Sequence, residues 1–227
     1  MSTFAQLKNN VTLELGLDDE AGEDEDTLLG RRLNEGVRAV LVQTHCRVEV
    51  ASTALTVGVA DYELPVAALA MHRLVTNPDL RECVRENPAT IHQLRESAAT
   101  GAAGYAYSYA LDGANLLMLY PTPAAADFLT LYYVPLPTEM VAVSDDPSAL
   151  VYGGIPVQWH DAIELWAMSK LASYDDDSTS KNGADYMRDF ELRITKIRLE
   201  IKKLGGRKQP RVRVNRRRYV SSDPSRT

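Results

Sequence analysis

The spacing of apolar residues changes twice along this chain, and the changes mark out segments of different structure. In residues 1–46 and 138–204 apolar residues recur every three or four positions, which is typical of amphipathic helices. In residues 47–137 they recur at every second position and include many β-branched and aromatic side chains, which is typical of strands. We therefore predict an α+β fold, in which helices from both segments form a bundle and a β-rich segment is inserted between them.

Two helices are predicted in residues 1–46. The first covers residues 2–15, and the second follows an acidic run and ends near Cys46. Asp26 is the predicted N-cap of the second helix, because a carboxylate at that position accepts hydrogen bonds from free backbone N–H groups. The apolar faces of the two helices consist of Phe4, Leu7, Val11 and Leu15, and of Leu29, Leu33, Val37, Val40, Leu41 and Thr44.

Alternating apolar residues predict short strands in residues 47–64, and further strands over 67–75 and 128–134. The piece between the prolines at 78 and 88 is compatible with a short helix. Residues 90–99 are predicted to be helical, because their apolar side chains return to one side.

A hairpin is predicted near residue 112. Tyr105, Tyr107 and Tyr109 alternate along its first strand, and residues 117–120 form its second. Asp112 followed by glycine is a typical turn sequence for a tight hairpin.

Two more helices are predicted in residues 138–204, after an irregular connection over 138–156. The helix over 159–174 is apolar around most of its circumference, which indicates central burial. The helix over 184–204 has a heptad seam, and Leu192 and Leu199 lie on nearly the opposite face. These two leucines either contact a neighbouring subunit or are two ordinary exposed side chains. The seam consists of Met187, Phe190, Ile194, Ile197, Ile201 and Leu204.

The charge of the chain reverses near its C-terminal end. Residues 1–204 contain 17 basic and 30 acidic residues, whereas 207–218 contain seven basic residues and no acid. Two glycines separate these segments, and in the second segment Val212 and Val214 alternate with arginines. Such a pattern favours an extended segment that docks on a surface, because the arginine fork suits carboxylate and phosphate groups. We therefore interpret residues 205–227 as a basic docking tail.

Motifs for catalysis are not found in this chain. It has no phosphate-binding glycine loop, no dinucleotide fingerprint and no nucleophile elbow. His160 and Glu164 have a spacing that could hold a metal, but no further ligand pair completes the site. Cys46 and Cys83 lack CxxC spacing and are interpreted as buried free thiols. We predict no enzyme activity, no catalytic residue, no cofactor and no bound metal. No stretch is long and apolar enough to span a membrane, and no secretion signal is predicted.

The order of these signals resembles the head–tail adaptor, or connector, proteins of tailed bacteriophages. The matching stretches extend from the early helix to the long closing helix, with prolines at the joints between elements. They are TLLGRRLNEGVRAVLVQ at 27–43, DYELP at 61–65, LLMLYPTP at 116–123, LTLYYVPLP at 129–137 and WHDAIELWAMSKLA at 159–172, the last preceded by Ile155 and Pro156.

This resemblance implies a structural virion protein at the head–tail junction, assembled in the host cytoplasm. Family members form a ring, typically a dodecamer, beneath the portal protein. The ring extends the DNA channel, through which DNA passes without specific binding, and gives tail proteins (nozzle or tail-completion proteins) a platform. Applied to this chain, the resemblance implies that Leu192 and Leu199 lie in the ring interface. It also implies a portal-binding tail formed by Arg207, Lys208, Arg211, Val212, Arg213, Val214, Arg216, Arg217, Arg218 and Tyr219.

The alternative is a nucleic-acid-binding protein whose arginine-rich tail grips phosphate groups directly. The tail taken alone favours this function. The acidic character of residues 1–204 argues against it, since negative charge repels the phosphate backbone. The sequence also lacks a helix-turn-helix, zinc or RNA-sheet signature.

Overall fold

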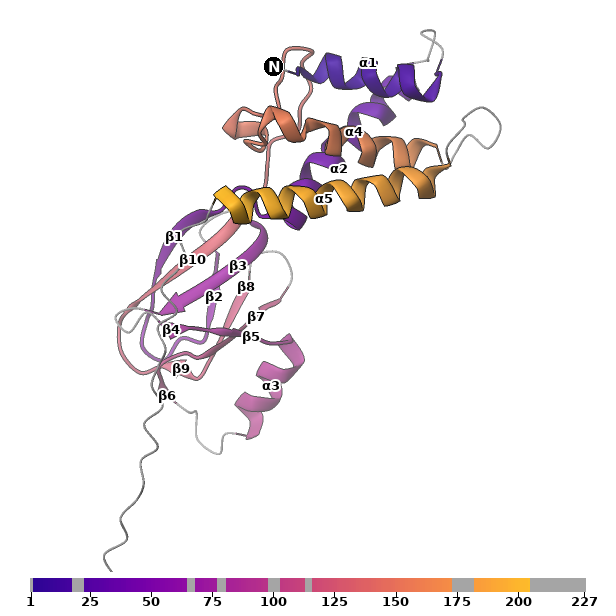
Figure 1. The fold of residues 1–227 in the computed structure, drawn as a ribbon. Coiled ribbons are helices and arrows are strands. Elements are labelled where there is room, and N and C mark those ends of the chain that lie inside the picture. The colour runs from indigo at the N-terminus through magenta and orange to yellow at the C-terminus, as the bar shows by residue number, and fades with distance from the viewer. Residues whose placement is uncertain are drawn as a thin grey trace, which may run out of the picture.

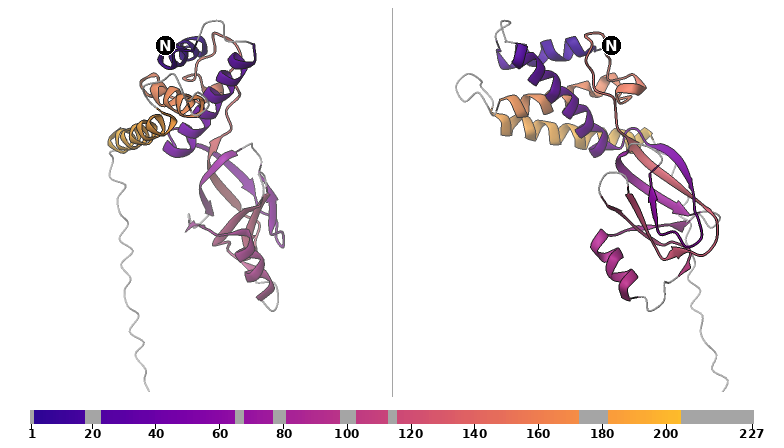
Figure 2. Two further views of the ribbon diagram at one scale, coloured as in Figure 1. Left: turned by 90° about the vertical axis from the view of Figure 1, so that its right-hand side faces the viewer. Right: turned by 180° about the vertical axis from the view of Figure 1, so that it is seen from behind.

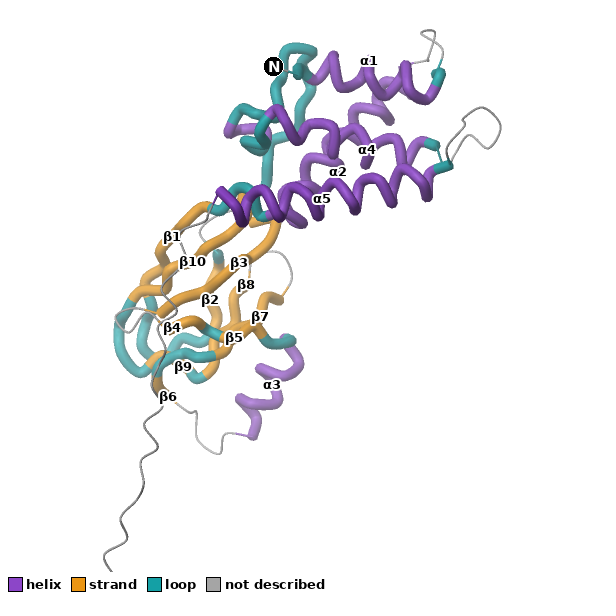
Figure 3. The backbone as a smooth tube through the Cα atoms, in the orientation of Figure 1, coloured by secondary structure: helices purple, strands orange, loops and turns teal. Residues whose placement is uncertain are grey.

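Helices gather at one end of the molecule and strands at the other (Figure 1). The computed structural model describes residues 2–17, 23–64, 68–76, 81–97, 103–112, 116–172 and 182–204. The helical end combines segments from before and after the strands, so the predicted α+β fold is confirmed. One further helix, α3 (Pro88–Ser97), lies against the strands (Figure 3).

The helical end is a layer packed around α4. Its helices are α1 (Phe4–Leu15), α2 (Glu23–Thr44), α4 (His160–Leu171) and α5 (Gly183–Leu204). α4 contacts each of the other three, and its side chains Ala162, Ile163 and Ala167 are fully buried, so its predicted central burial is confirmed. The predicted apolar faces of α1 and α2 are confirmed as well, because all ten of their residues are buried.

Local interactions at both ends explain where α1 begins and where it ends. The Thr3 hydroxyl accepts a hydrogen bond from the Gln6 backbone N–H at 3.4 Å, and the Gln6 side chain accepts one from the Thr3 N–H at 2.9 Å. This reciprocal pair is a capping box, which satisfies backbone donors that a helix start leaves free. Gly16 ends the helix in the left-handed region, with φ of 65°.

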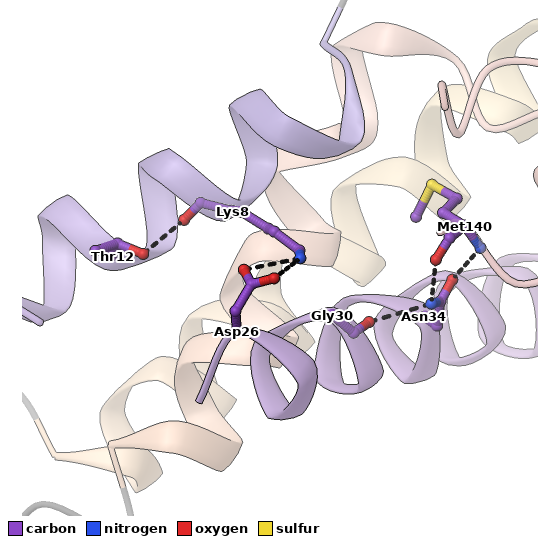
Figure 4. A network of polar contacts seen from close by, with 6 residues as sticks. All are labelled: Lys8, Thr12, Asp26, Gly30, Asn34 and Met140. Atoms are coloured by element: carbon purple, nitrogen blue, oxygen red, sulfur yellow. Dashed lines mark hydrogen bonds and ion pairs between the residues drawn. The ribbon is translucent and has the colours of Figure 1, made fainter. Parts of the chain in front are cut away.

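The predicted N-cap of α2 is wrong. α2 begins at Glu23, so Asp26 lies inside its first turn. The carboxylate of Asp26 in that turn complements the helix dipole. From this position the Asp26 carboxylate accepts two hydrogen bonds of 2.8 Å from Lys8 Nζ, and this ion pair joins α1 to α2 (Figure 4).

Asn34 fastens the connection that precedes α4 to the middle of α2 (Figure 4). Its Nδ2 donates to the carbonyl oxygens of Met140 at 3.0 Å and Gly30 at 3.1 Å, and its Oδ1 accepts from the Met140 N–H at 2.8 Å. The side chain thereby satisfies both backbone groups of a residue 106 positions away in the chain.

The strand end contains two four-stranded sheets, with orders β1-β10-β3-β4 and β2-β8-β7-β5, and a small pair, β6-β9. Leucines from both sheets, including Leu74, Leu117 and Leu131, share one core, so the two sheets pack face to face. The strands are β1 (Glu49–Ala54), β2 (Asp61–Glu63), β3 (Ala68–Thr76), β4 (Arg81–Glu82), β5 (Val84–Arg85), β6 (Ala103–Gly104), β7 (Ser108–Asp112), β8 (Leu116–Tyr120), β9 (Thr122–Pro123) and β10 (Phe128–Pro135).

The predicted hairpin is confirmed, although its first strand is shorter than expected. β7 pairs with β8 in antiparallel register from Ser108 opposite Tyr120 to Asp112 opposite Leu116, and the turn lies outside the described residues. Tyr105 and Tyr107 precede β7 and are more than half exposed, so the tyrosine alternation did not mark the start of the strand.

The piece between the prolines at 78 and 88 forms no helix in its described part, 81–87. Arg81 and Glu82 pair with β3, and Val84 and Arg85 take the open edge of β7 as a parallel strand. Pairing with a sheet on both sides of the buried Cys83 therefore fixes the conformation of the piece. The predicted helix that follows is confirmed as α3.

The helical and strand ends meet where α2 stops. His45 has a φ of 49°, a turn that directs the chain from α2 toward β1. Its ring meets that of His72 in β3 edge-on, with the two Nδ1 atoms 3.2 Å apart. Val134 of β10 belongs to the core of the helical layer, so apolar packing joins the two ends as well.

Replacement of Asn34 by alanine should destabilise the protein by about 1–3 kcal/mol, because the backbone groups of Met140 lose their partners. Urea unfolding followed by circular dichroism measures this change. Asn9→Ala, at an exposed position of α1, is the matched control. Equal stability of the two variants within about 0.5 kcal/mol would show that the anchor contributes little.

Acidification should destabilise the protein through His160. This side chain is buried at the start of α4, its Nε2 donates to the Ile155 carbonyl at 3.0 Å, and burial lowers the pKa of the ring. Its contribution is complete above the unfolded pKa of about 6.5 and is lost as pH falls below that value. We expect the free energy of unfolding to fall as the pH decreases below about 6.5, with a slope that stays below about 1.4 kcal/mol per pH unit because a single histidine takes up at most one proton.

Urea unfolding at pH 7.5 and 5.5 tests this expectation, and the pH dependence should shrink in His160→Gln. His92→Gln, at an exposed position of α3, should keep the pH dependence of the wild type. Identical pH dependence in wild type and His160→Gln would rule out this histidine as the cause.

Candidate assembly surfaces

The inner seam of α5 attaches this helix to the layer. Phe190, Ile194 and Ile197 are buried as the heptad spacing predicted, and Met187 and Ile201 pack against the same core. Leu204 does not belong to the seam, since it is 79% exposed and is the last residue of the helix. The predicted seam therefore ends one step early.

The outer face of α5 carries the two leucines that the sequence singled out. Leu192 is 55% exposed and Leu199 is 51% exposed, and the helical repeat places both opposite the buried seam. Lys196 and Lys203 continue the same stripe at steps of four residues, and both are exposed. We call these four residues the α5 stripe; it is apolar and basic.

Polar contacts along its flanks hold α5 in place. Arg193 Nε lies 2.6 Å from an Asp161 carboxylate oxygen, and Trp159 Nε1 donates to Glu200 Oε2 at 2.8 Å. Arg198 Nε donates to the backbone carbonyl of Gln43 in α2 at 2.7 Å. Because these contacts use the flanks and the seam uses the inner side, the α5 stripe remains uncovered by the described part of the chain.

A second exposed apolar surface lies on the connection between β10 and α4, which the sequence suggested only as an irregular segment. Val141 is 82% exposed, Val143 73% and Leu150 70%, and Val151 is more than half exposed. We call these four residues the connection surface. The signal that could have revealed it is a run of apolar residues without the helical or strand period that would bury them.

Hydrogen bonds fix the shape of this connection. Asp145 Oδ2 accepts from the backbone N–H groups of Val141 at 2.7 Å and Ala142 at 2.8 Å, and Tyr152 donates its hydroxyl to Asp145 Oδ1 at 2.8 Å. The Val141 hydrogen bond is the main reason why the pKa of Asp145 is lowered. The Phe4 N–H donates to the Asp145 carbonyl at 2.7 Å, so the start of α1 fastens the same loop.

The ten residues of the predicted portal-binding tail, from Arg207 to Tyr219, lie outside the described residues. The described chain stops at the end of α5, where Lys202 and Lys203 are exposed. The tail therefore follows directly on the helix that carries the α5 stripe.

The residues considered for chemistry have other partners. Glu164 accepts a hydrogen bond from Asn10 Nδ2 at 2.7 Å, and His160 is bonded to the Ile155 carbonyl. Burial raises the pKa of the Cys46 thiol, which makes it a poor nucleophile, and the neighbouring His45 ring contacts His72. Both cysteines are free, and Cys83 is buried as predicted, but Cys46 is only partly buried.

Metal-binding clusters of three or more His, Cys, Asp or Glu side chains do not occur within the described residues. Among the helices of the described part, none combines the length and the apolar character needed to cross a bilayer.

Comparison with known proteins agrees with a structural role in a phage particle. The model of the family described as SU10 adaptor protein matches residues 2–218, which is nearly the whole chain. A search of curated proteins finds no match. On the family match, this chain belongs to the SU10 adaptor family of phage head–tail adaptor proteins.

Proposed function

We propose that this adaptor forms a ring beneath the portal, extends the DNA channel and gives tail proteins a platform for attachment. Membership of the adaptor family implies a structural protein of the virion at the head–tail junction, in contact with portal and tail proteins. The observation that favours a ring is the α5 stripe, because its two leucines are half exposed on a helix that is otherwise firmly packed. Leu192 and Leu199 are the proposed ring contacts, and a dodecamer is the proposed state.

The charge of the chain suits a protein that surrounds DNA without gripping it. Residues 1–204 have a formal net charge of −13, from 17 basic and 30 acidic residues. A wall of like charge weakens phosphate binding and lets DNA slide. This is the proposed reason why passing DNA is not specifically bound.

The basic tail is the proposed portal-binding arm. A single exposed ion pair contributes only about 0–1 kcal/mol, so one arm would bind weakly. A ring presents many arms at once, and the high effective concentration after the first contact converts weak binding into lasting attachment. Arginines 207, 211, 213 and 216–218 would meet acidic groups of the portal, and Val212 and Val214 would fill apolar pockets.

The alternative function, direct binding of nucleic acid by the tail, is favoured by the arginine content alone. A DNA titration of the full chain at two salt concentrations separates the two functions. Tight binding with a steep salt dependence would support the alternative, and weak binding would support portal docking.

Deletion of residues 207–227 should leave a folded protein that no longer joins heads, because the described fold ends at Leu204. Co-sedimentation with purified heads that lack the adaptor should show a bound fraction at least about tenfold lower than that of the wild type. Deletion of residues 221–227 alone, which keeps every proposed tail contact, is the control. Normal attachment of the longer truncation would overturn the role of the tail.

Double replacement Leu192→Ser and Leu199→Ser should keep the melting temperature and weaken assembly on the portal. Loss of apolar burial at two positions should lower assembly at least about tenfold, since burying one leucine contributes about 1.5–3 kcal/mol. Mass photometry of adaptor–portal mixtures measures the change. Leu13→Ser alters a leucine that is 72% exposed on α1 and should assemble normally. Normal ring formation by the double variant would show that these leucines are ordinary surface residues.

A further inference from the structure

The connection surface is apolar and acidic, whereas the α5 stripe is apolar and basic. Residues 136–157 contain no lysine or arginine, and they contain three acids, Glu139, Asp145 and Asp146. Asp145 and Asp146 both have lowered pKa values and are charged at neutral pH, with hydrogen bonds from the loop as a cause in each case. Glu139 is paired with Arg38 of α2, and Arg47 donates to the Leu150 carbonyl, so the acidic character of this surface comes from Asp145 and Asp146 beside the exposed valines.

The α5 stripe is its counterpart. Leu192 and Leu199 are two helical turns apart, about 10 Å along the axis. Lys196 lies between them and Lys203 beyond them, so the stripe alternates apolar and basic contacts. A complementary partner must offer an apolar strip of similar length that is bordered by acids.

The two surfaces of one molecule do not face each other. The first half of the connection packs beside the start of α1, where the Ala5 N–H donates to the Val143 carbonyl at 3.2 Å, and Leu150 lies beside Arg47, just after the end of α2. α5 forms the edge of the helical layer that is nearest the strands, and α1 lies at the far edge (Figure 2). Contact between the two surfaces therefore requires a second copy of the chain.

We propose that the α5 stripe of one copy packs on the connection surface of the next copy, with the lysines of the stripe directed toward the acids of the loop. Such a contact joins two different surfaces and is heterologous, so it repeats from copy to copy and closes into a ring when the rotation between neighbours allows it. This inference rests on the proposed ring, and it identifies the surface that the α5 stripe contacts on the neighbouring copy.

Rigidity on both sides favours this contact. The connection is held by Asp145, Asn34 and the start of α1, and α5 is held by its seam and by Arg193. Neither surface has to be ordered on binding, so little conformational entropy is lost. The charges add selectivity, because two connection surfaces or two stripes would repel each other.

Disulfide trapping tests the pairing in the full chain. Val143→Cys and Leu199→Cys are prepared as separate variants, mixed in equal amounts, assembled on heads that lack the adaptor, and oxidised. We expect a disulfide-linked adaptor dimer in the mixture and not with either variant alone. Leu13→Cys mixed with Val143→Cys is the matched control and should give at least about tenfold less dimer. Cys83 is buried, and burial raises the pKa of the Cys46 thiol, so the native cysteines react slowly.

A ring that assembles without this crosslink overturns the pairing and leaves the proposed function intact. Crosslinking of either variant to a portal or tail protein also overturns it, since that surface then belongs to another partner. Failure of wild-type chain to form any ring on heads refutes the proposed function itself.

Charge exchange gives an independent measurement. Lys196→Glu should lower assembly on heads about tenfold, and Asp146→Lys in the same chain should restore most of it. Asp112→Lys, on β7 in the strand end, is the control and should restore nothing. Equal assembly of the single and double variants would contradict the pairing of these two surfaces.

Discussion

The close approach of α2 to α4 is the constraint on which the helical layer depends. A side-chain carbon at Gly36 would lie only 2.9 Å from the backbone oxygen of Ile163, so only glycine allows the two helices to come this near. α4 is thereby enclosed by α1, α2 and α5, which bury Ala162, Ile163 and Ala167 completely. α5 is left at the edge of the layer, with one face buried and the other free.

In this arrangement, different faces of α5 hold the fold and make the proposed assembly contact. The core uses the inner seam of α5, while ion pairs and backbone hydrogen bonds occupy its flanks. What remains is an outer face on an already rigid helix, which suits the proposed ring contact because little conformational entropy would be lost on binding. The connection before α4 follows the same principle, because its polar backbone is satisfied by Asp145 while its valines face outward.

Much of the fold could be predicted from spacing alone, since burial on one side of a helix or strand imposes a period. The predictions that failed concern residues whose conformation depends on tertiary contacts. Asp26 was predicted as the N-cap of α2 but lies in its first turn, where it pairs with Lys8. Residues 81–85 became strands because the edges of β3 and β7 were open to them. Leu204 matched the seam but lies at the helix end, where no described element covers it.

The sequence by itself determined the helix–strand–helix order, the heptad seam, the leucines on the reverse face of α5 and the separation of acidic and basic charge. Only the tertiary structure decided that Val141 and Leu150 stay exposed. Their exposure depends on contacts between distant segments, such as the one between Asn34 and Met140, which are 106 residues apart. Local spacing records which side of an element is apolar, but whether a loop is covered depends on where remote parts of the chain pack.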